Sequence, residues 1–436
     1  MGIFSSCGKK HLDGHKDLTH HDTIIDICGT VKNVYLPVVS PNGKDIEIVV
    51  KEGDEVKVGT RIGTRTDFYV PVYSPVSGVV KANVMKFNAT VGRPVNHVVI
   101  ENDFKYVKEE NVLTKVSLNS SQEELFGAIK EAGLVGLGGA GFPTYVKYNN
   151  PQNIQSLLIN AVECEPYLTT DYHSIKNDTE YLLKGAQLLV KALGANEAVI
   201  AFKVKKDDMK AAIEALLPNY EGVRIVEVPD LYPMGWERTL IKQVFKKTYN
   251  SLPSEVGVVV NNAQTVIALG HALLDGDTYS KRLVTVSGNG ITNPCNVLCP
   301  IGTPANELIA ACGGYNGEEI NLIPGGPMCG KAIVKDEFPI APQIGSLTVL
   351  QKVVYKAQAC LRCGECTMHC PSNLQPVEIQ IAVKKGDVER MLQLNAKSCV
   401  ECGMCSYVCP SHIEVTDNMR KAKIQIRLKE MKDAKK

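Results

Sequence analysis

Eight cysteines near the carboxyl end of the chain form two copies of one pattern, C-x2-C-x2-C-x3-C-P. The first copy consists of Cys360, Cys363, Cys366 and Cys370, and the second of Cys399, Cys402, Cys405 and Cys409. This spacing is typical of [4Fe–4S] ligation, in which a tight loop supplies three thiolates and the other run supplies the fourth. We therefore expect Cys409 to complete the cluster of the first loop and Cys370 that of the second. Zinc sites also use C-x2-C spacing, but two identical runs, each closed by proline, favour iron–sulfur clusters.

A glycine-rich stretch at residues 136–144 is the second candidate for chemistry. Gly136, Gly138 and Gly139 would let backbone N–H groups approach a phosphate or a flat ring without interference from a Cβ atom. Lys147 follows within reach as a cation for phosphate. A mobile turn is the alternative interpretation of such a loop.

Polar residues follow two apolar strand patterns. They are Asn160, Glu163 and Glu165 after the run 156–159, and Asn261, Asn262 and Thr265 after the run 256–260. Open α/β sheets bind ligands at the carboxyl ends of their strands, which is where the amide and two carboxylates of the first group stand. A loop with solvated acids is the alternative.

The elements around these motifs alternate between helix and strand. A helix is expected from about Ser121 to Gly133, where serine and an acidic first turn provide a start signal. Further helices are predicted at 179–193 and 206–217, and strands at 198–202 and 223–228. A helix at 377–386 separates the two cysteine runs, and 417–436 reads as a charged amphipathic helix. Its solvated state is favoured over contact with a partner or a membrane surface.

Composition limits the class of protein. At 436 residues the chain should hold about two to four domains. The net charge of +1 gives no reason to expect nucleic-acid binding, and no apolar run is long enough to span a bilayer. Fifteen cysteines without an export signal indicate a reducing compartment and metal ligation. Residues 1–28 carry four histidines, for which a solvated, mobile tail is favoured over a metal site.

Residues 29–104 resemble the barrel-sandwich, or lipoyl-like, domain. The resemblance rests on the strand-and-turn segments 52–59 and 74–80. Carrier versions of that domain hold their swinging arm on a hairpin lysine, whereas this chain has Arg65-Thr66-Asp67-Phe68-Tyr69 there. We therefore interpret the domain as a packing module and not as a carrier.

The next segment resembles the flavin-carrying, NADH-oxidising subunit of respiratory complex I. The shared motifs are a Gly-x-Gly-Gly-Ala-Gly-Phe-Pro-Thr loop, an Asn-Ala-x-Glu-x-Glu-Pro loop, a loosely matched Gly-x-Glu turn at Gly235-Trp236-Glu237 and an Asn-Asn-x-x-Thr strand end. Val162 stands where that family has aspartate. The resemblance implies that FMN is held by Gly136, Gly138, Gly139, Lys147, Asn160, Glu163, Glu237, Asn261, Asn262 and Thr265. It also implies that Phe142 faces the adenine of NADH and Glu165 the nicotinamide end.

Residues 280–350 look like the soluble ligand-binding β-grasp domain of the same family. The order of segments is similar to that of RnfC, a component of the Rnf complexes, the ion-translocating ferredoxin:NAD⁺ oxidoreductases of bacterial membranes. The expected fold is therefore multidomain α/β. Its parts are a polar tail (1–28), a barrel-sandwich domain (29–104), a Rossmann-like FMN/NADH domain (118–279), a β-grasp domain (280–350), an α-helical two-cluster ferredoxin-like domain (351–415) and a charged helix (416–436).

The resemblance implies a function as well. Electrons would pass between NAD(H), FMN and the two [4Fe–4S] clusters, because flavin can exchange hydride on one side and single electrons on the other. The chain would lie peripherally on the cytoplasmic face of the membrane. Other Rnf subunits would be its partners, and they would link it to ferredoxin and to Na⁺ or H⁺ translocation. Two alternatives are a soluble reductase serving another acceptor, such as proline reductase or a cobalamin, and an electron-relay scaffold without flavin, which Val162 and Trp236 suggest.

Overall fold

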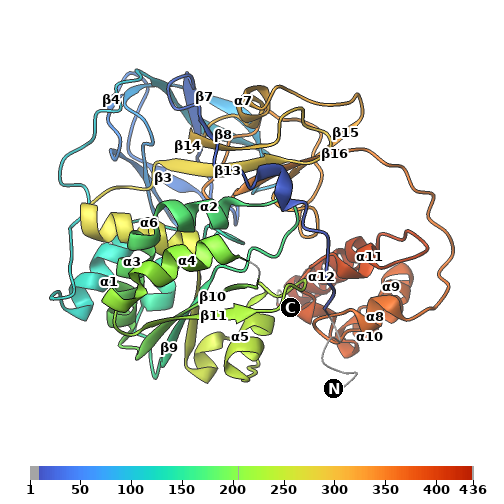
Figure 1. The fold of residues 1–436 in the computed structure, drawn as a ribbon. Helices are drawn as coiled ribbons and strands as arrows, with labels where there is room; N and C mark the ends of the chain where they lie inside the picture. The colour runs from blue at the N-terminus through green and yellow to red at the C-terminus, as the bar shows by residue number, and fades with distance from the viewer. Residues whose placement is uncertain (1–8, 205, 435–436) are drawn as a thin grey trace.

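The computed structural model describes residues 9–204 and 206–434. Two β-rich units lie together at the top of Figure 1, a helix-flanked sheet lies below them, and a helical unit lies to one side. A long connection after strand β16 leads to the helical unit. No helix within the described ranges is long and apolar enough to cross a membrane.

The first unit is a pair of small antiparallel sheets. One has the order β2-β8-β7-β4 and the other β3-β5-β6. Their strands are β2 (Asn33–Pro37), β3 (Ile46–Ile48), β4 (Glu55–Val56), β5 (Arg61–Arg65), β6 (Pro71–Tyr73), β7 (Gly78–Asn88) and β8 (Arg93–Asn102). Gly78 has φ 153°, and a Cβ atom there would lie 1.9 Å from the Glu101 carbonyl oxygen, so the β7–β8 pairing requires glycine at this point.

The β5–β6 hairpin carries the expected Arg65–Tyr69 segment and packs onto the next unit. Arg61 pairs with Glu131 at 2.6 Å, and the Tyr69 hydroxyl donates to the same carboxylate at 2.7 Å. The Tyr69 backbone N–H donates to the Tyr145 hydroxyl. These contacts fasten the hairpin to the second unit.

The second unit is a parallel sheet in the order β11-β10-β9-β12. Its strands are β9 (Ser156–Asn160), β10 (Glu197–Lys203), β11 (Val223–Val228) and β12 (Val258–Asn262). Its helices are α1 (Gln122–Glu131), α2 (Thr170–Asn177), α3 (Thr179–Leu193), α4 (Asp207–Leu216), α5 (Glu237–Phe245) and α6 (Ala263–Asp275), with short 3₁₀ turns η2 (Thr144–Tyr148), η3 (Leu217–Asn219) and η4 (Pro253–Val256). One face of the sheet shares a large core with α1 to α4 and α6, whereas α5 packs in a smaller core on the other face.

The third unit is a five-stranded sheet in the order β1-β14-β13-β16-β15. Its strands are β13 (Lys281–Ser287), β14 (Cys295–Pro300), β15 (Ile320–Pro324) and β16 (Ser346–Gln351), with helix α7 (Ala305–Ala311). The fifth strand, β1 (Ile24–Asp26), comes from the N-terminal segment and pairs in parallel with β14.

The expectation of a solvated tail is wrong for residues 9–28, while residues 1–8 lie outside the described part of the chain. Besides β1, this segment forms the turn η1 (Lys16–Thr19). The His15 ring stacks on Tyr167, and the His20 ring stacks on Tyr172 with centroids 4.0 Å apart. Ring stacking and the pairing of β1 with β14 thus hold the segment against the body of the molecule.

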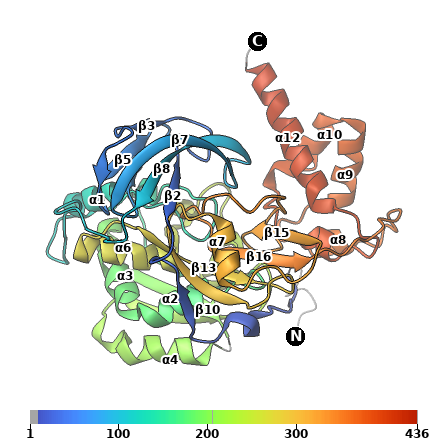
Figure 2. The ribbon, with the colours of Figure 1, turned by 90° about the horizontal axis from the view of Figure 1, so that it is seen from above.

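The fourth unit is helical. It contains α8 (Glu365–Met368), α9 (Pro376–Lys385), α10 (Val388–Gln393), α11 (Met404–Tyr407), α12 (Val415–Asp433) and the turn η5 (Ala396–Ser398). Helix α12 lies beside α9 and α10 in Figure 2 and buries Met419, Ala422 and Ile426 in their common core. The predicted charged terminal helix is therefore part of this unit, although its outer face is solvated, as expected.

Candidate functional site

The predicted polar residues gather at the reversal point of the parallel sheet. From β9 the chain continues to β10 and β11 on one side, and then returns to place β12 on the other side. Asn160 at the end of β9 is the register partner of Asn262 at the end of β12. In open α/β sheets, the crevice at such a reversal point is where ligands bind. We call this place the crevice.

The glycine-rich loop lies at the crevice and presents free backbone amides. Its base is held by two hydrogen bonds, in which the Leu137 N–H donates to Thr265 Oγ1 (3.0 Å) and the Leu137 carbonyl accepts from Arg282 (3.0 Å). Gly138, Gly139 and Ala140 are exposed residues, and their backbone N–H groups donate to no other residue in 9–204 or 206–434. Consecutive free N–H groups of this kind form an anion-binding concavity.

Gly138 is also packed closely against Asn262. A Cβ atom at position 138 would lie 2.6 Å from Asn262 Nδ2, whereas a Cβ at Gly139 would meet nothing within 4 Å. The loop and the end of β12 thus fit together only because residue 138 has no side chain.

Lys147 places a cation against β12, the strand whose end meets the glycine loop. Its Nζ donates to the Val260 carbonyl at 2.6 Å. Burial lowers the pKa of Lys147, and the nearby Glu237 carboxylate partly opposes this effect. A buried ammonium that donates to a neutral acceptor is stabilised further when an anion binds in the adjoining concavity.

The asparagines of the crevice are hydrogen-bonded within the chain. Asn160 Nδ2 donates to the Gly235 carbonyl at 2.8 Å, and Asn261 Nδ2 donates to the Tyr148 hydroxyl at 2.5 Å. Asn262 caps α6, because its Oδ1 accepts from the N–H groups of Gln264 and Thr265. These contacts fix the side-chain orientations before any ligand is present.

Glu163 stands in the crevice with a partner that the sequence did not indicate. Lys16, from the N-terminal segment, lies 3.3 Å from Glu163 Oε2 and also donates to the Leu168 carbonyl. Both side chains are largely buried, at 14% and 6% exposure. Glu163 has φ 45°, an uncommon value for a residue with a side chain, and such strain concentrates at functional sites. Lys16 falls in a polar stretch without any motif, so no sequence signal marks it.

Asp171 is a second residue that the sequence did not indicate. Its carboxylate accepts from Asn262 Nδ2 (2.9 Å) and Gln264 Nε2 (2.6 Å), and its N–H donates to Glu163 Oε1 (2.7 Å). Burial, together with the Glu163 charge, raises the pKa of Asp171 to about 6. A buried carboxyl with a perturbed pKa in a crevice is a recognised mark of a functional site.

Phe142 and Glu165, the two residues predicted to face NADH, have different surroundings. The Phe142 ring is 44% exposed and meets Phe68 of the β5–β6 hairpin edge to face, with centroids 5.7 Å apart. The Glu165 carboxylate instead accepts the N–H groups of Met328 (3.0 Å) and Cys329 (2.9 Å). Burial raises the pKa of Glu165.

Val162 and Glu237 lie in the two complex I motifs that the sequence matches imperfectly. The Val162 side chain is buried in the apolar core on the α5 face of the sheet. Glu237 begins α5, and its Oε1 accepts from the Tyr249 hydroxyl at 2.7 Å.

The cysteine runs come together in the helical unit. Cys370 of the first run and Cys399, Cys402 and Cys405 of the second line one small cavity. The first loop is tied to the end of the second run, since the Gln358 N–H donates to the Ser411 carbonyl and Ser411 Oγ donates to the Ala359 carbonyl, both at 2.9 Å. No three His, Cys, Asp or Glu side chains in the described ranges converge closely enough for a single metal ion.

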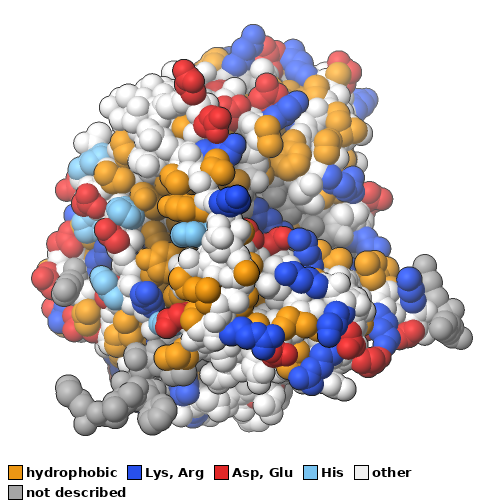
Figure 3. All heavy atoms as spheres, turned by 90° about the vertical axis from the view of Figure 1, so that its right-hand side faces the viewer, with side chains coloured by type: hydrophobic (Ala, Val, Ile, Leu, Met, Phe, Trp, Pro, Cys, Tyr) orange, Lys and Arg blue, Asp and Glu red, His pale blue; other side chains and the backbone are white. Residues whose placement is uncertain are grey.

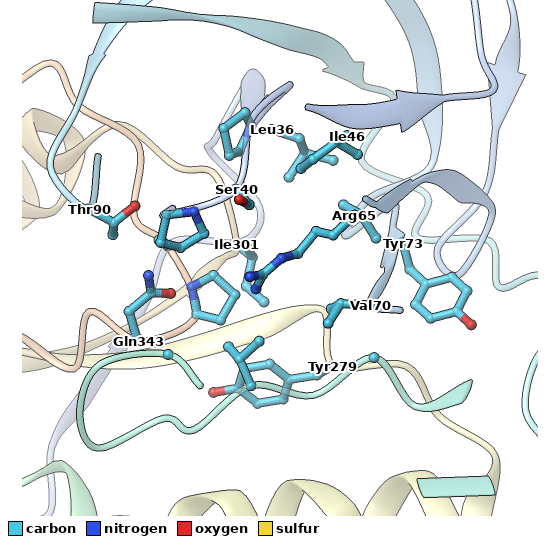
Figure 4. Close-up of a pocket in the computed structure, with 18 of the residues that line it drawn as sticks. Leu36, Ser40, Ile46, Arg65, Val70, Tyr73, Thr90, Tyr279, Ile301 and Gln343 are labelled. Atoms are coloured by element: carbon cyan, nitrogen blue, oxygen red, sulfur yellow. The ribbon is translucent and has the colours of Figure 1, made fainter. Parts of the chain in front are cut away.

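A separate cavity of about 140 Å³ lies where the first three units meet (Figure 4). Leu36, Arg65 and Val70 line it from the first unit, and Tyr279, Ile301 and Gln343 from the other side. Arg65 extends into this space, and its guanidinium pairs with Asp67. None of the predicted flavin or nucleotide residues lines it.

Four family models match the chain in succession. They are the RnfC barrel sandwich hybrid domain at residues 6–105, the Nuo51 FMN-binding domain at 129–271, the SLBB domain at 283–332 and the 4Fe-4S dicluster domain at 352–410. The chain is also 34% identical to the C subunit of the proton-translocating ferredoxin:NAD(+) oxidoreductase complex of Clostridium ljungdahlii, over 87% of this chain and 84% of that protein. This chain belongs to the RnfC family.

Two further relatives agree with this membership of the RnfC family. The chain is 34% identical to the C subunit of the ion-translocating oxidoreductase complex of Rhodobacter capsulatus, over 88% of this chain and 76% of that protein. It is 33% identical to the C subunit of the Na(+)-translocating ferredoxin:NAD(+) oxidoreductase complex of Acetobacterium woodii, over 79% of this chain and 80% of that protein.

A similar fold occurs in a chain of an NAD⁺-reducing [NiFe]-hydrogenase. The TM-score is 0.50 at 20% identity, over 70% of this chain and 63% of that chain. The likeness supports the fold alone, and the match spans less than two thirds of the hydrogenase chain. As a member of the RnfC family, the chain combines an FMN-binding domain with a 4Fe-4S dicluster domain.

The residues of the crevice fit FMN, and the cysteines fit two clusters. The free loop amides and the buried Lys147 suit the flavin phosphate, and the absence of a side chain at Gly138 lets the loop meet Asn262. Four thiolates around one cavity are the donor set of a [4Fe–4S] cluster.

Proposed function

We propose that this chain is the NAD(H)-oxidoreducing subunit of an Rnf-type complex. It would pass electrons between NAD(H), FMN and two [4Fe–4S] clusters, and partner subunits would couple this transfer to ferredoxin and to Na⁺ or H⁺ translocation. One observation carries the proposal: the same chain contains an anion-binding crevice at a sheet reversal point and eight cysteines in two ligating runs.

In this proposal FMN occupies the crevice. The N–H groups around Gly136, Gly138 and Gly139 and the Lys147 ammonium hold its phosphate. The other contacts come from Asn160, Glu163, Glu237, Asn261, Asn262 and Thr265. Bound flavin supplies the exchange between a hydride and single electrons. The residues themselves supply position, because Asn262 is fixed by both α6 and Asp171, and Thr265 is fixed by the glycine loop.

In this proposal NAD(H) approaches from the side of the exposed Phe142 ring. The Phe142 ring is partly exposed, and an exposed aromatic ring suits stacking with an adenine. Glu165 stands on the same β9 loop as Glu163, and we assign its carboxylate to the nicotinamide end of the dinucleotide. Release of its two N–H partners would be needed for direct contact, which makes Glu165 the less accessible of the two residues.

Two clusters with crossed ligands would carry the electrons onward. We assign Cys360, Cys363, Cys366 and Cys409 to one cluster, and Cys370, Cys399, Cys402 and Cys405 to the other. The shared cavity supports the second set, and the Ser411 contacts near Cys360 support the first.

The chain would work as a peripheral subunit on the cytoplasmic face of the membrane, bound to the iron–sulfur and membrane subunits of the complex. The face that carries the helical unit shows lysine and arginine side chains among hydrophobic ones (Figure 3). Mixed basic and apolar surfaces of this kind suit protein partners and anionic headgroups.

Reconstitution of the purified chain with iron, sulfide and FMN tests the proposal. We expect one flavin, two clusters of four irons each, and bleaching of both flavin and cluster absorbance by NADH. Iron without flavin, and no response to NADH, would identify a relay scaffold instead. Affinity purification from cells should recover the membrane subunits of the complex. Recovery of a soluble reductase partner in their place would support the alternative role.

A further inference from the structure

Tyr232 connects the crevice side of the parallel sheet to one cysteine loop. It follows β11, is 2% exposed, and donates its hydroxyl proton to the backbone carbonyl of Cys402 at 2.7 Å. The same hydroxyl lies 3.3 Å from Cys329 Sγ. The ring packs with Met404, next to the cysteine loop, and with Leu12 of the N-terminal segment. A buried tyrosine hydroxyl that finds a partner on another unit fixes the two units relative to each other.

The same segment reaches the crevice within three residues. The Gly235 carbonyl accepts Asn160 Nδ2 at 2.8 Å, and Asn160 is one of the residues proposed to hold FMN. Gly235 also packs against Cys164 of the β9 loop, since a Cβ there would lie 3.0 Å from Cys164 Sγ. The segment from Tyr232 to Gly235 is therefore a short bridge from the crevice to the loop of Cys402.

A second set of contacts runs parallel to this bridge. Glu165 holds the N–H groups of Met328 and Cys329, and the Cys329 carbonyl accepts from Arg420 of α12 at 2.9 Å. Arg420 also pairs with Glu401, inside the second cysteine run, at 3.1 Å. Gly403 packs against the Met328 backbone so closely that a Cβ atom would lie 2.2 Å from the Met328 carbonyl oxygen. The second run is thus docked against the body of the molecule.

The first cysteine loop faces outward. Cys360 and Cys363 are exposed, and Leu361 between them is 70% exposed. Its contacts stay inside the helical unit, through Ser411 and through a Tyr355–His412 ring stack with centroids 4.4 Å apart. Within the described ranges, no hydrogen bond or ion pair joins residues 352–366 to the parallel-sheet unit.

We propose that the cluster of Cys370, Cys399, Cys402 and Cys405 is the inner cluster, which exchanges electrons with the flavin, and that Tyr232 is the positioning residue that holds its loop at the crevice. The cluster of Cys360, Cys363, Cys366 and Cys409 is then the outer cluster, which exchanges electrons with the partner protein. This inference rests on the proposed function. Each step moves one electron: the donor centre loses it, the acceptor cluster gains it, and no covalent bond forms or breaks. The two electrons of NADH leave the crevice one after the other.

Matched double variants test the order of the clusters. Cys399→Ser/Cys402→Ser removes the inner cluster, and Cys360→Ser/Cys363→Ser removes the outer one. The chelator bathophenanthroline should strip iron several-fold faster from the variant that keeps only the outer cluster. This readout needs neither flavin nor NADH, so it is independent of the proposed function. Equal rates, or faster loss from the inner cluster, would overturn the order.

Electron paramagnetic resonance after rapid mixing with NADH gives the second readout. The variant that keeps the inner cluster should show a reduced-cluster signal as fast as the wild type. The variant that keeps only the outer cluster should stay oxidised over that time, although dithionite reduces it. Fast reduction of the outer cluster alone would contradict the proposal.

Tyr232→Phe isolates the positioning role, because it keeps the ring and removes only the hydroxyl. We expect unchanged iron and FMN content, a several-fold slower reduction of the inner cluster by NADH, and an altered signal of that cluster only. Tyr407→Phe is the control, since Tyr407 lies near the same loop but its hydroxyl bonds to no residue in the described ranges. If Tyr232→Phe and Tyr407→Phe behave alike, Tyr232 has no positioning role.

Discussion

Asp171 joins three residues of the crevice, although no sequence motif names it. It holds the amides of Asn262 and Gln264, and its own N–H supports Glu163. The Lys16 ammonium supports Glu163 from the other side. The charges of the crevice are thus arranged before a flavin binds, which lowers the cost of ordering on binding.

Asp171→Asn should change how stability depends on pH. The unfolded chain loses the Asp171 proton near pH ~3.9, whereas the folded chain keeps it to about pH 6. Between these values the folded state binds more protons, so the Asp171 contribution to the free energy of unfolding falls as pH rises, by up to ~3 kcal/mol. The melting temperature of Asp171→Asn relative to wild type should therefore increase from about pH 4 to about pH 7.

Asp208→Asn is the control for this pH series, because the pKa of Asp208 is lowered in the folded chain and its trend must have the opposite sign. If the melting temperatures of wild type and Asp171→Asn differ by the same amount at every pH, Asp171 does not titrate as described.

Lys147→Met should separate stability from flavin affinity. Methionine keeps the length of the side chain and removes a charge whose burial is unfavourable, so the melting temperature of the flavin-free protein should not fall. The FMN phosphate loses a hydrogen bond from a charged donor, and such a bond contributes roughly 1.5–3 kcal/mol. The dissociation constant of FMN should therefore rise about ten- to hundredfold. Fluorescence titration with FMN measures this. Unchanged FMN affinity would remove Lys147 from the site.

At the scale of elements, the sequence predicted those helices and strands whose start signals and hydrophobic patterns are local. Helix α1 begins at Ser121 with Glu124 closing a capping box, as the sequence indicated, and α3 and β11 occupy their predicted ranges. Strand β1 was missed because its three residues are stabilised by pairing with β14, some 270 positions later in the chain. Pairing over such a separation leaves no mark in the local sequence pattern.

The candidate site also contains one part that the sequence predicted and one part that it did not. The cysteine runs and the glycine loop are contiguous, so their spacing could be read directly from the sequence. Lys16, Asp171 and Arg282 join the crevice from three separate segments, and none of them belongs to a motif that the sequence displays. Their roles follow from tertiary packing, which a single sequence does not display.

Gly138→Ala tests whether the fit of the glycine loop against β12 matters for flavin binding. The added methyl group would lie 2.6 Å from Asn262 Nδ2 and 3.0 Å from its Cβ, so the loop or Asn262 must shift. Overpacking of this kind costs roughly 1–3 kcal/mol, which is about ten- to hundredfold in FMN affinity. Gly139→Ala, where a Cβ meets nothing within 4 Å, should bind FMN nearly as wild type does. Equal affinities for the two variants would contradict the described packing.

On the scale of the whole molecule, the units are packed against one another. The first unit and the five-stranded sheet share one hydrophobic core, in which Val34 and Ile62 pack in the same cluster as Val284 and Val297. The N-terminal segment joins that sheet through β1 and joins the crevice through Lys16. These contacts couple the first unit, the five-stranded sheet and the crevice to one another.

Arg282 is the residue that best tests this coupling. It extends from β13, is 1% exposed, and donates to the Ile344 carbonyl, the Gln264 side chain and the Leu137 carbonyl of the glycine loop. Arg282→Met would leave these acceptors without a donor, at roughly 1–3 kcal/mol for each group that stays dry. It would also remove a positive charge near Asp171, whose pKa should rise further.

We therefore expect Arg282→Met to lower the melting temperature by several degrees and to weaken FMN binding at the same time, because the glycine loop loses its support from the five-stranded sheet. Differential scanning calorimetry and FMN titration measure the two effects. Arg61→Met is the matched control: it breaks the more exposed pair with Glu131, and such pairs contribute at most about 1 kcal/mol. If Arg282→Met reduced stability but left FMN affinity intact, the glycine loop would not depend on the five-stranded sheet. The two units would then be coupled through their packing alone.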